Sequence, residues 1–441
     1  MQDCIVIGGG LSGMAAAAAL GEAGLSVQLF ESKGFLGGRA ASYPQPSPHP
    51  DPELIDNCQH ILLRCCVNLL DFYRRLNVAG QIRFHREFHF FEPGGRVSHL
   101  RSSSLPAPLH FSRTFPGLKF LALADKVAIA RALWTIQLQR GRRKDLDRTT
   151  MLDWLRETGQ TRRAIGRFWR PVLVSAINEE LDRMAASHGF QVFWLAFLAR
   201  SDSYEMGVPS VTLSQLYASE AWQRFPNVQI CLRAPVERVL VEDGEVRGVV
   251  SGGEEYQARW YLCAVPFDRI AGLVPELQLD LSRYEHSPIT GIHLWFDRPV
   301  TEFPHGVLLD RTIQWFFNKE SGRYLQIVVS ASRQLTGMPR GEVIGLAVRE
   351  LAEFLPAVRD AKLEKAHVVK EVRATFSACP GLESLRPPAA TRLRNLFLAG
   401  DWTRSGWPAT MEGAVRSGHI AAEAITAAEG RPGKFLLPDI A

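Results

Sequence analysis

The sequence lacks the features that mark several large classes of protein. No apolar run in its 441 residues approaches the roughly 18 residues that span a bilayer, so we expect no transmembrane helix. Its seven cysteines are an odd number without C-x-x-C spacing, which predicts reduced and mostly structural thiols. A net charge of +5 is small at this length and no nucleic-acid motif is present, so we expect neither nucleic-acid binding nor a bound metal.

No basic segment precedes the first apolar run, as a secretory signal would require. We therefore expect the chain to start inside its fold and to reside in the cytoplasm. With 46% apolar and 22% charged residues it is composed like a soluble globular protein, and it is long enough for two hydrophobic cores. Proline occupies every second position from 44 to 52, which predicts a stiff extended surface loop that is either a spacer or a rim of the substrate mouth.

A strand, a glycine-rich turn and a helix are predicted at the N-terminus. Residues 4–7 form a short apolar run that suits a buried strand, and Gly8, Gly10 and Gly13 follow in the G-x-G-x-x-G arrangement before an alanine-rich segment. Gly8 permits the tight turn, Gly10 lets the backbone approach a pyrophosphate, and Gly13 lets the helix pack against the strand. The pattern predicts a dinucleotide site of the Rossmann type.

The next motifs indicate which dinucleotide binds. Residues 25–30 predict a second strand, which delivers Glu31 to the place where a carboxylate accepts from ribose hydroxyls. Gly37, Gly38 and Arg39 follow. The backbone at the two glycines can come close to the same pyrophosphate, and the guanidinium can bind it, both from its other side. A plain NAD site does not need this second clamp.

A third motif stretch lies near the other end of the chain, at residues 395–425. A strand ends there in Gly400 and Asp401, and a small-residue helix begins near Thr410. The Asp401 carboxylate can hold a ribityl hydroxyl, and the Met411 amide can donate to the N1/C2 edge of a flavin. The positive end of that helix would stabilise an anionic reduced ring.

These motifs together resemble the flavin amine oxidase and phytoene desaturase superfamily. Three stretches, DNCQHILLRCCVNLLDFYRRL at 56–76, FWRPVLVSAINE at 168–179 and GWPATMEGAVRSG at 406–418, are similar to the hydroxysqualene dehydroxylase family in particular. The resemblance covers essentially the whole chain. It implies FAD as the cofactor and an α/β fold, in which a Rossmann-like FAD-binding domain of the GR2 type carries an inserted α+β substrate domain of antiparallel sheet and helices.

The resemblance implies a division of the chain and further cofactor contacts. The FAD-binding domain is expected at residues 1–80, 225–280 and 391–430, a helical region facing substrate or membrane at 81–224, the sheet of the substrate domain at 281–390, and a tail at 431–441. The further expected contacts are Leu11, Ser12, Ser32, Gln59, His60 and Val236, the last through its backbone to the adenine. His60 either contacts the flavin ring or is a packing residue.

The middle of the chain predicts an apolar, membrane-facing region. A helix is expected at residues 61–76, short strands at 84–91 and 96–100, and an amphipathic helix at 118–140 that ends in RGRRK. That helix fits either a membrane interface or a core position with a solvated charged end. Residues 189–199 are nearly all apolar and predict a helix that is buried or lines an apolar cavity, and residues 207–210 end the helical run.

The chemistry implied by the resemblance is reductive. Amine oxidases that share the MEGAV motif usually carry an aromatic residue directly before Met, and this chain has Thr410, so an amine loses its cation–π partner. No second glycine-rich fingerprint binds NAD(P)H, so electrons come from a transient donor or leave to an acceptor. The implied reaction, of squalene and hopanoid biosynthesis, converts hydroxysqualene, a C30 polyprenyl alcohol, into squalene at the inner face of the cell membrane, by loss of the allylic hydroxyl and hydride transfer from flavin N5.

Three other readings stay open. The same residues serve a carotenoid or apocarotenoid desaturase, an amine oxidase or a flavin-binding scaffold without turnover. No catalytic acid is assigned, and His60 and Glu179 are the two candidates, with Glu179 alternatively a structural cap or ion-pair partner.

Overall fold

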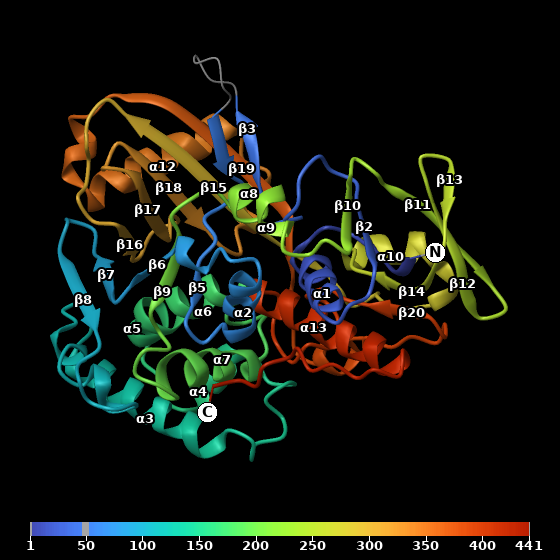
Figure 1. The fold of residues 1–441 in the computed structure, drawn as a ribbon. Coiled ribbons are helices and arrows are strands. Elements are labelled where there is room, and N and C mark those ends of the chain that lie inside the picture. The colour runs from blue at the N-terminus through green and yellow to red at the C-terminus, as the bar shows by residue number, and fades with distance from the viewer. Residues whose placement is uncertain (1, 46–52, 441) are drawn as a thin grey trace.

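The structure is a computed structural model, and it describes residues 2–45 and 53–440. A five-stranded, wholly parallel sheet forms one half of the molecule (Figure 1), in the order β10-β2-β1-β14-β20. Its strands are β1 (Gln2–Ile7), β2 (Val27–Glu31), β10 (Val228–Leu232), β14 (Ala258–Cys263) and β20 (Leu396–Leu398). They come from three distant parts of the chain, as the Rossmann-like expectation requires.

Two helices pack together beside this sheet, α1 (Leu11–Glu22) and α13 (Met411–Ala428). Small residues allow their close approach, since a Cβ built at Gly418 would lie 2.2 Å from the Ser12 carbonyl oxygen. The alanine run of α1 is buried on every side, so this helix belongs to the core rather than to an amphipathic surface. The packing brings the N-termini of both helices to the same side of the sheet.

A second, seven-stranded sheet forms the other half, in the order β19-β15-β18-β17-β16-β7-β8 (Figure 1). Its strands are β7 (Glu87–Phe91), β8 (Val97–Arg101), β15 (His286–Phe296), β16 (His305–Leu308), β17 (Trp315–Glu320), β18 (Tyr324–Val329) and β19 (Leu363–Phe376). All pairings are antiparallel except that of β16 with β7. The helix α12 (Arg340–Phe354) packs its apolar side chains against this sheet. The mixed α/β architecture confirms the expected fold class.

A helical layer lies below the antiparallel sheet in Figure 1, and the C-terminus ends beside it. It contains α3 (Leu123–Gln139), α4 (Met151–Glu157), α5 (Arg162–Ala164), α6 (Arg170–Ile177) and α7 (Ala186–Phe193), with π-helical turns at Ile165–Trp169 and Trp194–Leu198. Pro171 is the second residue of α6, which follows the first π-helical turn directly. No helix of the described segments is long and apolar enough to cross a bilayer.

Small sheets and helices connect these layers. The remaining strands are β3 (Ser42–Gln45) paired with β4 (Glu53–Asp56), β5 (Leu62–Leu63) and β6 (Ile82–His85) on either side of β9 (Met206–Pro209), and the meander β11 (Val236–Glu242), β12 (Glu245–Ser251) and β13 (Glu254–Tyr256). The remaining α-helices are α2 (Val67–Arg75), α8 (Leu213–Leu216), α9 (Ser219–Trp222), α10 (Phe267–Leu273) and α11 (Arg333–Thr336).

One local prediction was wrong. The helix expected at residues 61–76 begins only at Val67, because Leu62 and Leu63 pair with β9 instead. The helical run is over before residues 207–210, as expected, and most of that segment belongs to β9, which pairs with β5 on one side and β6 on the other. Most of the proline-rich loop, residues 46–52, lies outside the described residues.

Candidate active site

A cleft of about 910 Å³ lies at the carboxyl ends of the parallel strands. Of the described candidates for cofactor binding, all but Gly13 line it, namely Gly8, Gly10, Leu11, Ser12, Glu31, Ser32, Gly37, Gly38, Arg39, Gln59, His60, Val236, Gly400, Asp401, Thr410 and Met411. The carboxyl edge of a parallel sheet is where doubly wound folds bind nucleotides, so the cleft has the position expected for the dinucleotide.

The glycine turn leaves the N-terminus of α1 free for an anion. Gly8 has φ +109°, which a side chain would strain, and a Cβ at Gly13 would lie 2.0 Å from the Gly8 carbonyl oxygen. Gly13 therefore supports the turn from beneath instead of lining the cleft. Gly10 is the N-cap, and within the described chain no side chain caps the helix. The amides of the first turn are therefore available to a phosphate.

Glu31 is held rigidly at the edge of the cleft. One of its carboxylate oxygens, Oε2, accepts from the Gly9 amide at 2.8 Å, and the other, Oε1, accepts from the Lys33 amide at 2.7 Å. Ser32 Oγ also donates to Oε1 at 3.1 Å, so of the roughly four acceptor sites of a carboxylate about one remains for a ribose hydroxyl. The arrangement fits the adenosine ribose of a dinucleotide.

Arg39 and Asp401 form an ion pair in the same cleft. The Arg39 Nη2 atom donates to Asp401 Oδ1 at 2.6 Å, and its Nη1 atom donates to the Ala374 carbonyl oxygen at 2.8 Å. The sequence assigned these two side chains to different parts of the cofactor. Their pairing fixes the guanidinium with one face still on the cleft, which fits contact with a pyrophosphate or its ribityl neighbour.

His60 and Gln59 lie where the cleft turns towards the substrate domain. The His60 Nδ1 atom is 2.9 Å from the Cys58 carbonyl oxygen, and since a carbonyl only accepts, Nδ1 carries the proton and Nε2 is bare in the neutral ring. Burial lowers the pKa of His60. These contacts suit His60 to accept a hydrogen bond rather than to donate a proton. The Gln59 Oε1 atom accepts from Lys319 Nζ at 3.0 Å.

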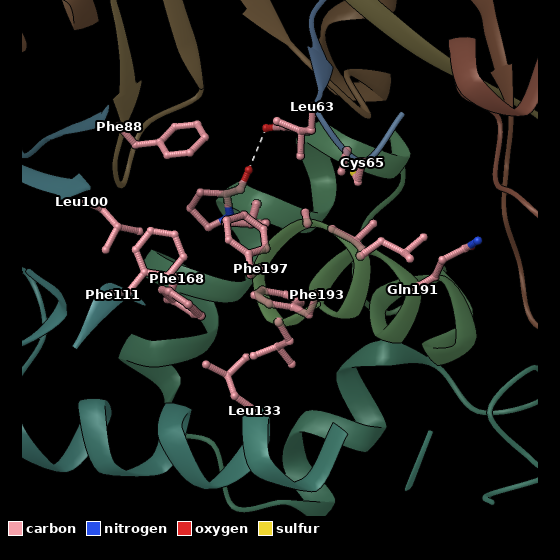
Figure 2. Close-up of a pocket in the computed structure, with 18 of the residues that line it drawn as sticks. Leu63, Cys65, Phe88, Leu100, Phe111, Leu133, Phe168, Gln191, Phe193 and Phe197 are labelled. Carbon is pink, nitrogen blue, oxygen red and sulfur yellow. Dashed lines mark hydrogen bonds between the residues drawn. The ribbon is translucent and has the colours of Figure 1, made fainter. Parts of the chain in front are cut away.

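A second cavity, of about 480 Å³, is almost wholly apolar. In Figure 2 the rings of Phe88, Phe111, Phe168, Phe193 and Phe197 gather around it, between the antiparallel sheet and the helical layer. Among its described lining residues the ionisable side chains are Cys65, Cys66 and Glu412. The cavity therefore suits an apolar ligand better than a cation.

Glu412 is buried, which raises the pKa of its carboxyl group to about 7. Its carboxylate accepts from the Asn68 and Leu69 amides at 3.1 and 2.7 Å and from the Asn68 side-chain amide at 2.9 Å. These donors lie in the first turn of α2, so Glu412 caps that helix from a distant part of the chain.

The two cavities meet at a throat, which we define as the residues that line both, namely Ile61, Ser175, Ala176, Trp315, Thr410 and Met411. Ser175 Oγ accepts from Trp315 Nε1 at 2.6 Å and donates to the Pro171 carbonyl oxygen at 2.7 Å, which leaves it one acceptor lone pair. Thr410 Oγ1 accepts from the Gly413 amide at 3.0 Å and so caps α13. The throat therefore offers oxygen acceptors between apolar walls.

Sequence reasoning missed Ser175 and Trp315. Ser175 lies inside the motif stretch at 168–179, and Trp315 begins an aromatic strand, but nothing in either pattern signals that they meet. Glu179, one of the two candidates for an acid, lies outside both cavities. It is fully buried and forms two 2.7 Å bonds with the Arg333 guanidinium, as a structural ion pair does.

The sheet, the uncapped glycine turn and the acid at the end of β2 define a dinucleotide-binding oxidoreductase of the Rossmann type. The sequence profile described as "Flavin containing amine oxidoreductase" matches residues 11–426. The chain belongs to this family of flavin-dependent oxidoreductases, and its cofactor is FAD. The superfamily resemblance and the expected cofactor are confirmed.

Individual relatives divide between two activities. The chain is 29% identical to a hydroxysqualene dehydroxylase of Rhodopseudomonas palustris, over 96% of this chain and 98% of the relative. It is 25% identical to a zeta-carotene desaturase of Synechocystis, over 97% of each chain. A solved oxidoreductase from Methanosarcina mazei has the same fold, with a TM-score of 0.71 and 17% identity over 96% of this chain and all of the other.

Proposed function

We propose that this flavin oxidoreductase reduces hydroxysqualene to squalene. The observation that carries the proposal is the throat, where an aromatic and aliphatic cavity opens directly onto the FAD cleft beside the hydroxyl acceptor of Ser175. A polyprenyl alcohol matches both properties, because its chain is apolar and its hydroxyl needs a hydrogen-bond partner once buried. The 29% identical dehydroxylase supports this substrate.

The chemistry requires a hydride and a proton. The allylic C–O bond breaks, the hydroxyl takes up a proton and leaves as water, and the new C–H bond forms with hydride that reduced flavin supplies when bound. A transient electron donor provides the two electrons for each turnover. The protein holds the substrate hydroxyl through Ser175, keeps the apolar walls around the reacting carbon, and so excludes the water that would recapture an allylic cation.

We assign the cofactor contacts as follows. The amides after Gly8 and Gly10 bind the pyrophosphate, with Gly13 supporting the turn, and Glu31 binds the adenosine ribose. The Arg39–Asp401 pair lies along the pyrophosphate and ribityl chain, and the first turn of α13 stabilises negative charge on the flavin ring. We propose that the FAD-binding and substrate domains follow the expected segments, with β7 and β8 as additional strands of the substrate sheet.

We also propose that the enzyme works on the cytoplasmic membrane surface. Nine large apolar side chains are exposed in the described segments. Five of them are 48% to 78% exposed, namely Leu109 and, on α3, Leu123, Val127, Trp134 and Leu138. At 3.6 residues per turn, the four on α3 fall within about 60° of arc. Leu109 and Trp134 also line the apolar cavity. Exposing a C30 chain to water costs on the order of 20 kcal/mol, so transfer from a bilayer through this patch avoids that cost.

An anaerobic turnover assay tests the reaction. The purified enzyme with photoreduced FAD is mixed with hydroxysqualene in liposomes, while flavin absorbance is followed and the lipid is extracted. We expect squalene to appear in step with flavin oxidation. Unchanged hydroxysqualene with fully reduced flavin would refute the assignment.

Carotenoid desaturation is the second candidate, favoured by the 25% identity to a zeta-carotene desaturase over nearly the whole chain. That reaction runs in the opposite direction, from substrate to oxidised flavin. Oxidised enzyme incubated with phytoene-type polyenes and a quinone would yield more conjugated products under this alternative, and none under the dehydroxylase proposal.

A further inference from the structure

Three ligand-type side chains meet on the outer face of the β7–β8 hairpin. His89 and His99 are directly opposite each other in the antiparallel register, and Glu87 lies two residues before His89, on the same face of β7. The Nδ1 atoms of His89 and His99 are 3.0 Å apart, and His99 Nδ1 is 2.9 Å from Glu87 Oε1. All three ligand atoms lie within 4.8 Å of one another.

We propose that Glu87, His89 and His99 bind a divalent transition-metal ion of the zinc type. Zinc takes imidazole nitrogen at about 2.0–2.1 Å and carboxylate oxygen at about 2.0–2.2 Å, so two ligand atoms on one tetrahedral ion are about 3.3 Å apart. The observed separations of 3.0 and 2.9 Å need only open by a few tenths of an ångström to admit the ion. Water completes the coordination, because the site is open to solvent on the side of His99.

The surroundings hold the ligands in place. The Phe303 ring packs edge-on against the His89 ring, with centroids 5.1 Å apart, and lies 6.4 Å from the His99 ring. Both imidazoles sit on paired strands rather than on a loop, so their spacing is fixed by the sheet register. A soft or borderline ion with nitrogen preference fits this set better than Mg²⁺ or Ca²⁺, which require mostly oxygen ligands.

The site has a structural consequence for the apolar cavity. The alternate residues of the same hairpin, Phe88, Phe90 and Leu100, line the cavity on the opposite face, and Figure 2 shows Phe88 and Leu100 directed into it. An ion that joins β7 to β8 from outside therefore clamps one wall of the cavity. Within this hairpin β8 is the edge strand of the seven-stranded sheet, whereas β7 also pairs with β16, so the ion would restrain chiefly the outer strand.

The test uses untagged, FAD-loaded protein that has been dialysed against a chelator. Co²⁺ is titrated as a spectroscopic probe and then displaced by Zn²⁺, with calorimetry in parallel. We expect one ion per chain, visible-region Co²⁺ bands, and a rise in melting temperature with added Zn²⁺. The His99→Ala variant should weaken binding at least tenfold and abolish the thermal shift. Glu87→Gln, which keeps both imidazoles, should weaken it less.

His367→Ala is the matched control, because His367 lies on β19 of the same sheet, away from the hairpin. Its binding should equal that of the wild type, and the flavin spectrum of each variant reports whether the fold is intact. Binding that is unchanged in His99→Ala, or no saturable binding by the wild-type protein, would overturn the proposal. Neither result bears on the dehydroxylase reaction, so the two proposals stand or fall separately.

Discussion

Arg39 and Asp401 are 362 residues apart in the sequence and form a 2.6 Å ion pair in the FAD cleft. The pair connects the segment after β2, near the N-terminus, to the segment after β20, near the C-terminus, and both segments belong to the cofactor-binding half. Asp401 is almost fully buried while Arg39 keeps about a third of its side chain exposed. The guanidinium thus reaches the cleft with its position already fixed.

This pair predicts a loss of cofactor affinity when either member is removed. Arg39→Ala deletes a charge-assisted donor, and Asp401→Asn removes the ion pair and leaves the guanidinium bound only to the Ala374 carbonyl oxygen, each at a cost of about 1.5 to 3 kcal/mol. Fluorescence titration should show FAD affinity reduced about tenfold or more in both. Arg392→Ala, a surface arginine, is the control and should bind FAD normally. Unchanged affinity in both pair variants would show that the pair is purely structural.

Ser175→Ala should change how the enzyme distinguishes alcohol from hydrocarbon. Without the Ser175 oxygen, the substrate hydroxyl loses its acceptor on α6, which costs about 1 to 3 kcal/mol. The dissociation constant for hydroxysqualene should rise about tenfold, while that for squalene stays constant. Ser112→Ala, which also shortens a serine in the cavity lining, is the matched control. An equal loss for both ligands would point to packing instead of hydroxyl recognition.

The exposed face of α3 predicts membrane binding. In the double variant Leu123→Glu/Val127→Glu, two carboxylates replace apolar contacts without touching the residues that line the cavity. Sedimentation with anionic vesicles should show at least a tenfold lower bound fraction, while turnover in detergent is retained. Val372→Glu/Leu385→Glu, at exposed apolar positions elsewhere, should bind vesicles normally. Equal binding by both double variants would remove α3 as the contact.

Buried His419 predicts acid sensitivity. Burial lowers its pKa to about 4 from an ordinary 6.5, so between these values the unfolded chain binds a proton that the folded chain does not. Stability therefore rises with pH across that window, and acidification from pH 6.5 to 4 costs up to about 3 kcal/mol from this group. His419→Gln should flatten the pH dependence of the unfolding free energy, measured by denaturant titration from pH 4 to 8.

The control for this experiment is Leu385→Gln, because Leu385 is exposed and carries no ionisable group. It should keep the wild-type slope. A His419→Gln slope identical to that of the wild type below pH 6.5 would show that His419 is not a source of the acid sensitivity.

Short sequence motifs were enough to predict the cofactor-binding half of the molecule. The positions of Gly8, Gly10 and Gly13 follow from backbone geometry within one turn, and Glu31 follows from the length of one helix and one strand. These relations join residues that are close in the sequence, so they can be predicted without knowledge of the rest of the fold. The antiparallel substrate sheet was expected through the family resemblance.

The features that the sequence did not predict depend on strand pairing between residues far apart in the chain. Leu62 and Leu63 are not part of the expected helix, because they form strand hydrogen bonds with β9, over 140 residues later in the chain. The hairpin β7–β8 joins the substrate sheet only because Val307 and Leu308 of β16 pair with Phe90 and Phe91.

By itself, the sequence determined the parallel FAD-binding unit, the identity of its cofactor and the apolar nature of the substrate region. Only the tertiary structure decided three side-chain contacts. Arg39 pairs with Asp401, and Glu179 pairs with Arg333. Ser175 and Trp315 form a hydrogen bond at the throat. The physical reason is that periodicity and turn chemistry act between neighbours in the chain. Contacts across hundreds of residues depend on how whole layers pack against one another, which no local pattern records.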